Sequence, residues 1–209
     1  MKNLAIALCG LIIVLLAVFL FTAKHKFGTD DLAIPSQVPI PSETPKVMFN
    51  NESTAQASKV PFPVLAADLI NAKKATIQTE KGNIVIQFFG EAPLAASNFI
   101  YLADKGFYNG LKFHRREEGF VIQGGDPNGN GTGGPGYSFA DERVTRDYKK
   151  GIVAMANSGP NTNGSQFFIM LADTPQLPKQ YTIFGQVIEG QDVVDQIAVG
   201  DVMQKVTIE

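Results

Sequence analysis

Two stretches of the sequence hold the residues whose types and spacing could do chemistry. They are FHRREEGFVIQGGD over residues 113–126 and MANSGPNTNGSQFFIM over residues 155–170. Six of their residues are candidates for a common site, one cation, two aromatic rings and three side-chain amides: Arg115, Phe120, Phe168, Gln123, Asn157 and Gln166. Taken singly, each residue has an ordinary structural explanation. Taken together, they describe a groove with an apolar pocket, hydrogen-bonding amides and a fixed cation, which suits an extended peptide better than a small polar metabolite.

Covalent and metal chemistry find little support in the same sequence. A nucleophile-and-base triad needs a histidine, and the two present are His25, near the N-terminal apolar segment, and His114. His114 falls in a predicted strand, facing away from its neighbours Phe113 and Arg115, so we expect a packed structural histidine. No histidine and carboxylate cluster has metal-ligand spacing, and we expect no metal and no cofactor. The acids in and near these stretches are expected in solvated loops: Glu117, Glu118, Asp126, Asp141 and Glu142.

The glycine-rich segment GNGTGG over 129–134 formally matches the G-x-G-x-x-G dinucleotide fingerprint. A dinucleotide site requires the last glycine to open a helix whose N-terminus faces the pyrophosphate. Here Pro135 and Gly136 continue the loop instead, and the Gly-Lys-Ser/Thr of a phosphate-binding loop is absent. The segment is therefore predicted to form tight turns on a rim.

The elements that must position these residues are mostly short strands. Alternation of apolar and polar residues predicts eight strands, over 75–80, 83–89, 111–114, 120–123, 152–156, 166–171, 183–188 and 202–208, with a tight hairpin turn at Lys81-Gly82. Pro93 begins a helix that ends at Gly106, and residues 191–198 suit a second helix. The pattern predicts a mainly β fold, a closed eight-stranded antiparallel barrel capped by two helices.

The N-terminal third differs in composition from the rest. Leu4 to Ala23 is uncharged, and as a helix these residues would span about 30 Å, the hydrocarbon thickness of a bilayer. Residues 1–23 are therefore predicted to be a signal anchor, because a cleaved signal peptide has an apolar core of only about 7 to 15 residues. Residues 24–74 hold half of the twelve prolines and are predicted to be a flexible linker of roughly 40 Å reach, within which residues 64–70 favour a short helix.

Composition also limits location and partners. The short N-terminus ahead of a long domain favours an extracytoplasmic, membrane-anchored domain over residues 75–209, or a secreted one if the segment is cleaved. This domain has more acidic than basic side chains, so we expect no nucleic-acid partner. Cys9, the one cysteine, lies in the apolar segment and leaves no disulfide within the chain. A tethered monomer is the default expectation.

Several motifs, in order and with similar spacing, resemble those of cyclophilin-type peptidyl-prolyl cis-trans isomerases. They are FHR at 113, GFVIQGGD at 119, GTGG at 131, MANSGPNTNGSQFFI at 155 and FGQVIEG at 184. The resemblance covers essentially all of residues 75–209. With its N-terminal apolar segment, the whole chain is similar to the N-terminally membrane-anchored bacterial members of the family. It implies an eight-stranded barrel with two helices and catalysis of rotation about X-Pro peptide bonds, assisting protein folding. Proline-containing polypeptides are the implied partners.

The resemblance also implies roles for individual residues. It places catalysis on Arg115, Phe120, Gln123 and Asn157. It places substrate binding on Val121, Gly131, Ala156, Ser158, Gln166, Phe168, Leu177 and Tyr181. The chain departs from many members at Gln176, where a tryptophan that helps to bind cyclosporin is common, and at Tyr181 and Val121, where histidine and methionine are common. A non-catalytic proline-peptide-binding or chaperone module of the same fold is the alternative.

Overall fold

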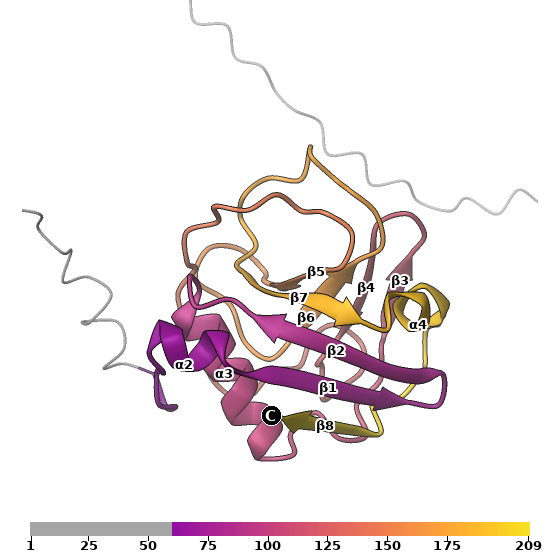
Figure 1. The fold of residues 1–209 in the computed structure, drawn as a ribbon, viewed down its shortest axis with the longest axis horizontal. Coiled ribbons are helices and arrows are strands. Elements are labelled where there is room, and N and C mark those ends of the chain that lie inside the picture. Colours follow the sequence, from indigo (N-terminus) through magenta and orange to yellow (C-terminus); the bar gives the residue numbers. More distant parts are fainter. Residues whose placement is uncertain (1–59) are drawn as a thin grey trace, which may run out of the picture. The chain divides into compact units, whose positions relative to one another are not determined.

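The fold is built on one antiparallel sheet of eight strands, seen in a computed structural model that describes residues 60–209 (Figure 1). The order across the sheet is β3-β4-β6-β5-β7-β2-β1-β8. The strands are β1 (Lys74–Thr79), β2 (Gly82–Phe88), β3 (Arg115–Glu117), β4 (Val121–Gly124), β5 (Ile152–Met155), β6 (Phe167–Met170), β7 (Ile183–Glu189) and β8 (Lys205–Ile208). The mainly β class and the eight strands agree with the sequence prediction. The predicted anchor, residues 1–23, and the linker up to residue 59 lie outside the described residues.

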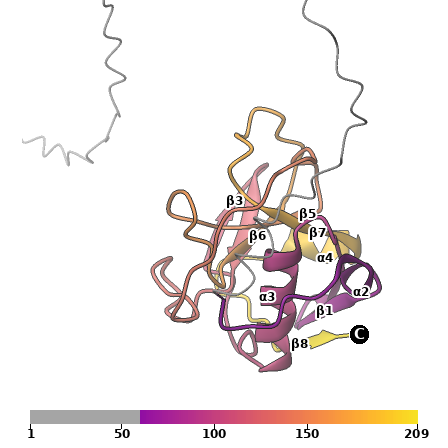
Figure 2. The ribbon, with the colours of Figure 1, turned by 90° about the vertical axis from the view of Figure 1, so that its left-hand side faces the viewer.

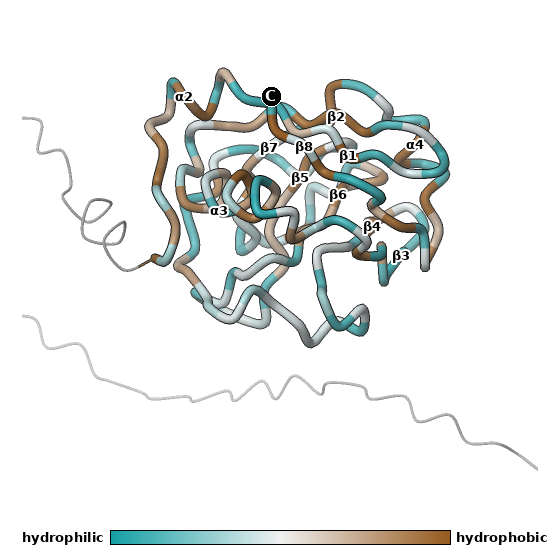
Figure 3. Tube along the Cα trace, turned by 90° about the horizontal axis from the view of Figure 1, so that it is seen from below, coloured by the Kyte–Doolittle hydropathy of each residue, from teal (hydrophilic) through white to brown (hydrophobic). Residues whose placement is uncertain are grey.

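Alternation along each strand separates two hydrophobic clusters. In β6, Phe167 and Ile169 face the larger cluster inside the curled sheet, whereas Phe168 and Met170 belong to a smaller cluster on the outer face. Loops cover this outer face, so β5 and β6 are buried along their whole length. Figure 3 shows hydrophobic stretches concentrated in the strands and helices and more hydrophilic or neutral residues in the long loops. The loops leave uncovered the edge of the outer cluster at Phe120, Leu177 and Tyr181, and this edge lines a pocket.

The predicted closed barrel is instead a curled half-barrel with β3 and β8 at its two edges. Residues 110–113, just before β3, hydrogen-bond to residues 200–203, just before β8. The Phe113 N–H donates to the Asp201 carbonyl at 2.8 Å, and the Gly200 N–H donates to the Phe113 carbonyl at 2.9 Å. The strand predicted over 111–114 was therefore wrong: this segment holds one isolated bridge, at Lys112, and the strand proper begins at Arg115.

Three described helices lie against the sheet. They are α2 (Ala67–Asn71), α3 (Pro93–Asp104) and α4 (Gln191–Gln196), with α2 and α3 on the left of Figure 1 and α4 on the right. Pro93 begins α3 as predicted, because its fixed φ suits the first helical turn and its missing N–H is not needed there. Among residues 60–209, no helix combines the length and apolar character that crossing a membrane requires.

The first hairpin shows how local backbone geometry shifts a boundary. Thr79 pairs with Gly82, so the two-residue turn is Glu80-Lys81 rather than the predicted Lys81-Gly82. The Thr79 hydroxyl donates to the Gly82 carbonyl at 2.8 Å and accepts from the Lys81 N–H at 3.1 Å. Gly82 closes the turn at a φ of 131°, a conformation that other residues rarely adopt.

Residues 60–73, which the sequence analysis counts in the linker, pack on the sheet and α3. Phe62 is buried, with its ring 5.7 Å from that of Tyr137 and 5.8 Å from that of Phe139. The Leu65 N–H donates to the Ser97 hydroxyl of α3 at 2.9 Å. The segment is visible in Figure 2 as the indigo chain that runs past α3 into α2. These contacts make the segment part of the packed domain.

Candidate active site

The site is organised by one row of residues across the outer face of the sheet. Arg115 in β3 pairs with Gln123 in β4, and Gln123 pairs with Phe168 in β6. Phe168 pairs in turn with Ala154 in β5. Directly opposed residues in antiparallel strands share a face, so this register brings the cation, the amide and the aromatic ring side by side. Residues far apart in the sequence thus become neighbours.

An apolar pocket of about 160 Å³ lies beside this row. It is lined by Arg115, Phe120, Val121, Gln123, Ala156, Asn157, Phe168, Leu177 and Tyr181. An apolar cavity of roughly 150 Å³ holds a benzene ring, so there is room for a proline ring. Among its lining residues Arg115 alone is charged. The structure thus brings nine of the twelve predicted site residues to one pocket.

Tyr181 forms one wall of the pocket and is held from both sides. Its ring packs edge-on against Phe168, with 5.6 Å between ring centroids. The Tyr148 hydroxyl donates to the Tyr181 carbonyl at 2.9 Å and accepts from the Tyr181 N–H at 3.0 Å. Sequence reasoning missed Tyr148, because the contact joins residues 33 positions apart and no local pattern signals it. Burial raises the pKa of Tyr148, which keeps the hydroxyl protonated and able to donate.

A relay of side-chain amides orients the arginine. Arg115 Nη1 donates to Gln123 Oε1 at 3.0 Å, and Gln123 Nε2 donates to Gln166 Oε1 at 2.9 Å. Gln166 Nε2 donates to the carbonyls of Gly131 and Gly133 at 3.0 and 2.8 Å. Each amide is fixed in one orientation because its oxygen accepts and its nitrogen donates within the same chain of bonds. The relay ties the cation to the glycine-rich rim.

Arg115 also forms an ion pair with Glu117, two residues along β3. Arg115 Nη2 lies 2.5 Å from Glu117 Oε1, and the two side chains are 42% and 50% exposed. Glu117 was predicted to lie in a solvated loop, but it is a strand residue on the same face as Arg115. Exposed pairs of this kind contribute little to stability, about 0 to 1 kcal/mol. The role of Glu117 is to orient the guanidinium, because it binds Nη2 alone and leaves the remaining N–H groups of Arg115 to Gln123 and to a ligand.

A second cavity, of about 730 Å³, shares Gln123, Ala156 and Asn157 with the first. Its other lining residues include the three remaining predicted site residues: Gly131, Ser158 and Gln166. The walls are mainly glycine-rich loops, and no described helix begins at them. The tight turn lies at residues 127–128, residues 129–131 bend, and residues 132–134 form irregular loop, so the rim is a loop as predicted but the turn precedes residues 129–134. A peptide lying in the first pocket could extend into this cavity.

Asp126 holds the glycine-rich loop in place through hydrogen bonds to its backbone. It is buried, and its carboxylate accepts from the backbone N–H groups of Asn128 at 2.8 Å, Asn130 at 2.9 Å and Gly131 at 2.5 Å. The expectation of a solvated acid was wrong here. Burial by itself raises the pKa of Asp126, but these three donors outweigh it and the pKa is lowered. An Asp placed two residues before the first N–H it binds is a local signal that could have been read.

Glu142 was also expected in solvent, and the structure places it at the N-terminus of α3. Its two oxygens accept from the N–H groups of Leu94 at 2.8 Å and Ala95 at 2.9 Å. Ala92, the residue before the helix, has no side chain that can cap it. Burial raises the pKa of Glu142 to about 7, against the two hydrogen bonds, which lower it. A distant loop thus supplies the cap that the local sequence lacks.

Asn157 lies where the two cavities meet. Its Nδ2 donates to the Gln180 carbonyl at 2.9 Å, and its Oδ1 accepts from the Gly159 N–H at 3.3 Å. The neighbouring Ser158 N–H donates to the Thr162 hydroxyl at 2.9 Å. These bonds hold the loop after β5 in place, so that its backbone can face an extended ligand.

His114 is half-buried, and both of its ring nitrogens are buried without a hydrogen-bond partner. Burial lowers its pKa, an effect opposed by Asp126 and reinforced by Arg115. A neutral, packed imidazole agrees with the structural role that alternation predicted. Within residues 60–209 no group of three or more metal-ligating side chains is placed to hold an ion.

The fold and the site together define a class of β proteins with a peptide groove on the outer face of a half-barrel. The family model described as cyclophilin type peptidyl-prolyl cis-trans isomerase/CLD matches residues 74–209. The chain belongs to this family, and its function is that of a cyclophilin-type peptidyl-prolyl cis-trans isomerase.

Individual relatives agree with this assignment. The chain is 45% identical over 150 residues to a peptidyl-prolyl cis-trans isomerase of Helicobacter pylori, covering 69% of this chain and 92% of that protein. It is 48% identical over 147 residues to peptidyl-prolyl cis-trans isomerase A of Mycobacterium tuberculosis, covering 59% and 79%. A cyclophilin crystal structure from Cryptosporidium parvum is 35% identical with a TM-score of 0.61, covering 66% and 97%, and a second was obtained in the presence of the dipeptide Ala-Pro.

Proposed function

We propose that Arg115 is the catalytic group of this isomerase and that the two cavities form one groove for an extended, proline-containing polypeptide. Rotation about an X-Pro bond faces a barrier of about 18 to 20 kcal/mol and takes tens to hundreds of seconds unaided. An enzyme that turns over about 10 to 1,000 times per second removes roughly 4 to 7 kcal/mol of it. No bond breaks, so no nucleophile is required.

The barrier arises from amide resonance, which the arginine can oppose. As the bond twists, the prolyl nitrogen regains its lone pair and becomes a hydrogen-bond acceptor. A guanidinium N–H aimed at this nitrogen binds the twisted state more strongly than either planar state, which is the condition for catalysis. The relay through Gln123 and Gln166 holds the guanidinium in place, so little reorganisation accompanies the twist.

The remaining residues hold the two ends of the rotating bond. The proline ring fits the pocket walled by Phe120, Phe168 and Leu177. Asn157 and Gln123 are placed to bind the flanking backbone, and a neighbouring substrate residue would enter the second cavity. Fixing one end while the other rotates keeps the reacting bond near the arginine.

The observation that carries this proposal is the position of Arg115, the charged residue of the apolar pocket, at the end of the amide relay. We expect Arg115→Ala to lower kcat/KM on a proline peptide by about 100-fold or more, as removal of one such transition-state donor does elsewhere. Arg143→Ala is the matched control, because Arg143 is exposed and lines neither cavity. Full activity in a folded Arg115→Ala protein would refute the role of Arg115. Peptide binding by the wild type without isomerisation above the uncatalysed rate would instead support the alternative, a binding or chaperone module that needs the pocket but not the cation.

We also propose that residues 1–23 anchor the enzyme in a membrane, with a monomeric domain acting on folding polypeptides outside the cytoplasm. The support is the run of twenty uncharged residues from Leu4 to Ala23, followed by a proline-rich segment. The expected result is that the protein sediments with membranes and that protease added to intact cells removes the domain. A domain that is protected in intact cells and digested after lysis would place it on the cytoplasmic side.

A further inference from the structure

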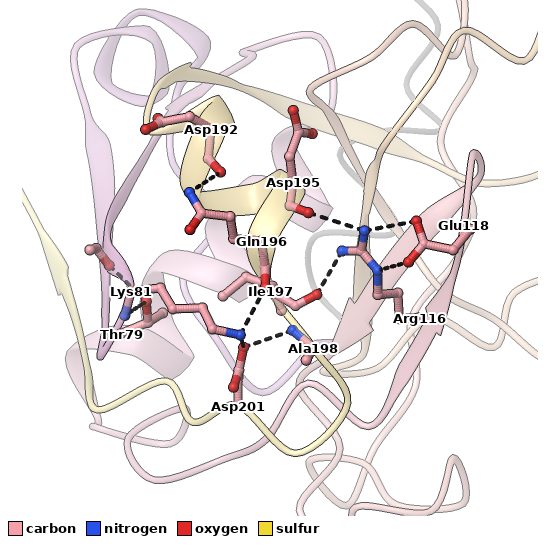
Figure 4. Close-up of polar contacts among 11 residues, drawn as sticks. Thr79, Lys81, Arg116, Glu118, Asp192, Asp195, Gln196, Ile197, Ala198 and Asp201 are labelled. Atoms are coloured by element: carbon pink, nitrogen blue, oxygen red, sulfur yellow. Dashed lines mark hydrogen bonds and ion pairs between the residues drawn. The ribbon is translucent and has the colours of Figure 1, made fainter.

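We propose that Arg116 is a positioning residue, which fixes the catalytic strand β3 to the end of α4 and thereby aims Arg115. This inference rests on the proposed role of Arg115. Alternation along β3 sends the two arginines to opposite faces of the strand: Arg115 toward the pocket and Arg116 toward α4. Figure 4 shows the Arg116 guanidinium between Glu118 and the last turn of α4.

The contacts of Arg116 use both edges of its guanidinium. Nη1 donates to the Ile197 carbonyl at 2.6 Å and Nη2 to the Asp195 carbonyl at 3.1 Å. On the other side, Nε and Nη2 donate to the two oxygens of Glu118 at 2.5 and 2.9 Å. The carbonyls at the end of a helix lack intrahelical partners and attract cations. Arg116 is 18% exposed, whereas Glu118 is 80% exposed.

The end of α4 is fixed mainly by Ile197, whose side chain is fully buried in the core, so it can serve as a base for Arg116 even when Lys81 is removed. Lys81, from the β1–β2 turn, donates to the Gln196 carbonyl at 2.8 Å and lies 2.5 Å from Asp201. Asp201 accepts from the Ala198 N–H at 2.7 Å. Lys81 and Arg116 therefore bind the same helix end, but the Lys81 side chain forms no hydrogen bond or ion pair with β3. This difference supplies a matched control.

β3 needs such a fixture because it is a three-residue strand at the edge of the sheet. It pairs with β4 alone, and the chain turns back at Gly119 directly after it. Short edge strands fray easily, and fraying here would move the Arg115 guanidinium relative to the prolyl nitrogen. The other groups that grip the substrate lie on different segments: Gln123 on β4, Asn157 after β5 and Phe168 on β6. Loss of the fixture should therefore impair catalysis more than binding.

The test compares four variants of the full-length protein by NMR exchange measurements on a proline peptide at increasing concentrations, which separate kcat from KM. Arg116→Ala is expected to lower kcat by about tenfold to 100-fold, the upper figure being the cost of roughly 1 Å of misplacement, while KM changes less than threefold. Arg116→Lys should recover part of the loss, since one ammonium can still bind one carbonyl. Glu118→Ala, at an exposed position, should lower kcat by a smaller factor without loss of fold. Lys81→Ala should lower the unfolding midpoint but leave kcat unchanged.

The positioning role would be overturned if Arg116→Ala kept its kcat, or if Arg116→Ala and Lys81→Ala lost kcat equally. If Arg116→Ala fails to fold, Glu118→Ala decides: unchanged kcat there contradicts the inference. The guanidinium resonances of Arg115 give an independent readout, expected to shift in Arg116→Ala and not in Lys81→Ala. Arg115→Ala, measured alongside, separates the two proposals. Its full activity would refute the role of Arg115, whereas loss in Arg115→Ala with none in Arg116→Ala refutes the positioning role alone.

Discussion

The carboxylate of Glu142 should make the stability of the domain depend on pH near neutrality. Its pKa is raised to about 7 in the folded protein, from an ordinary value of 4.5, chiefly because burial disfavours the charged form. The folded state therefore binds the proton more tightly than the unfolded state. Stability is greatest when the group is protonated, below about pH 4.5, and declines as the pH rises toward about 7.

The size of this decline follows from the two pKa values. Their difference corresponds to about 3 kcal/mol, at roughly 1.36 kcal/mol per pH unit. This is an upper figure, because the N-terminus of α3 faces the carboxylate and favours the ionised form. Glutamine cannot titrate, so Glu142→Gln should remove this contribution. Urea denaturation of the wild type and the variant at several values between pH 4.5 and 8 would measure the difference in unfolding free energy.

The control is Glu91→Gln, at an exposed glutamate whose carboxylate pairs with Arg146 on the surface. Its stability should follow that of the wild type at every pH. The reasoning fails if the free-energy difference between wild type and Glu142→Gln is constant over this range. It also fails if the wild type gains stability relative to the variant as the pH rises, since this would mean that the helix end and the two N–H groups outweigh burial.

Three further predictions concern Gln123 of the relay, the buried Phe62 and the exposed Gln176. Gln123→Leu breaks the hydrogen bonds to Arg115 and Gln166. It should lower kcat/KM by about tenfold to 100-fold, since a hydrogen bond to a charged group contributes roughly 1.5 to 3 kcal/mol. An unchanged kcat/KM would show that the relay does not hold the arginine. Phe62→Ala should destabilise the domain by about 3 to 5 kcal/mol, the usual cost of a deleted core aromatic ring, with kcat/KM unchanged below the transition; a small effect in urea denaturation would contradict its burial. Cyclosporin should inhibit weakly, because the exposed Gln176 offers no indole, and inhibition as tight as that of a tryptophan-bearing relative would refute this.

The sequence predicts well which residues lie together in the pocket where the alternation of residues along a strand determines the side they face. Alternation places Gln123 on one face of β4 and Phe168 on one face of β6. The two side chains become neighbours once the strands pair in the register that sets Gln123 opposite Phe168. Pro93 marks the start of α3 by its own stereochemistry. The glycine-rich segment is correctly separated from a dinucleotide loop, because the chain continues as a loop through Pro135 and Gly136 and no helix begins there.

The errors occur where burial or hydrogen bonding is supplied by a distant segment. Apolar residues before His114 suggest a strand, but their hydrogen-bond partners come from residues 200–203, which join them in only one bridge. Asp126 and Glu142 look like solvated acids until the backbone N–H groups around them are seen. A polar side chain in a sequence does not reveal whether water or protein will satisfy it.

The sequence by itself determined the chemistry of the groove, because the residue types and strand alternation specify an apolar pocket, amides and a cation on one face. The tertiary structure alone decided how firmly these groups are held. Phe62 enters the core, Glu142 caps α3, and Arg116 joins β3 to α4 through contacts that span up to 81 positions in the chain. Such contacts depend on how the sheet curls and on where its edges end, and no local pattern of residues encodes either.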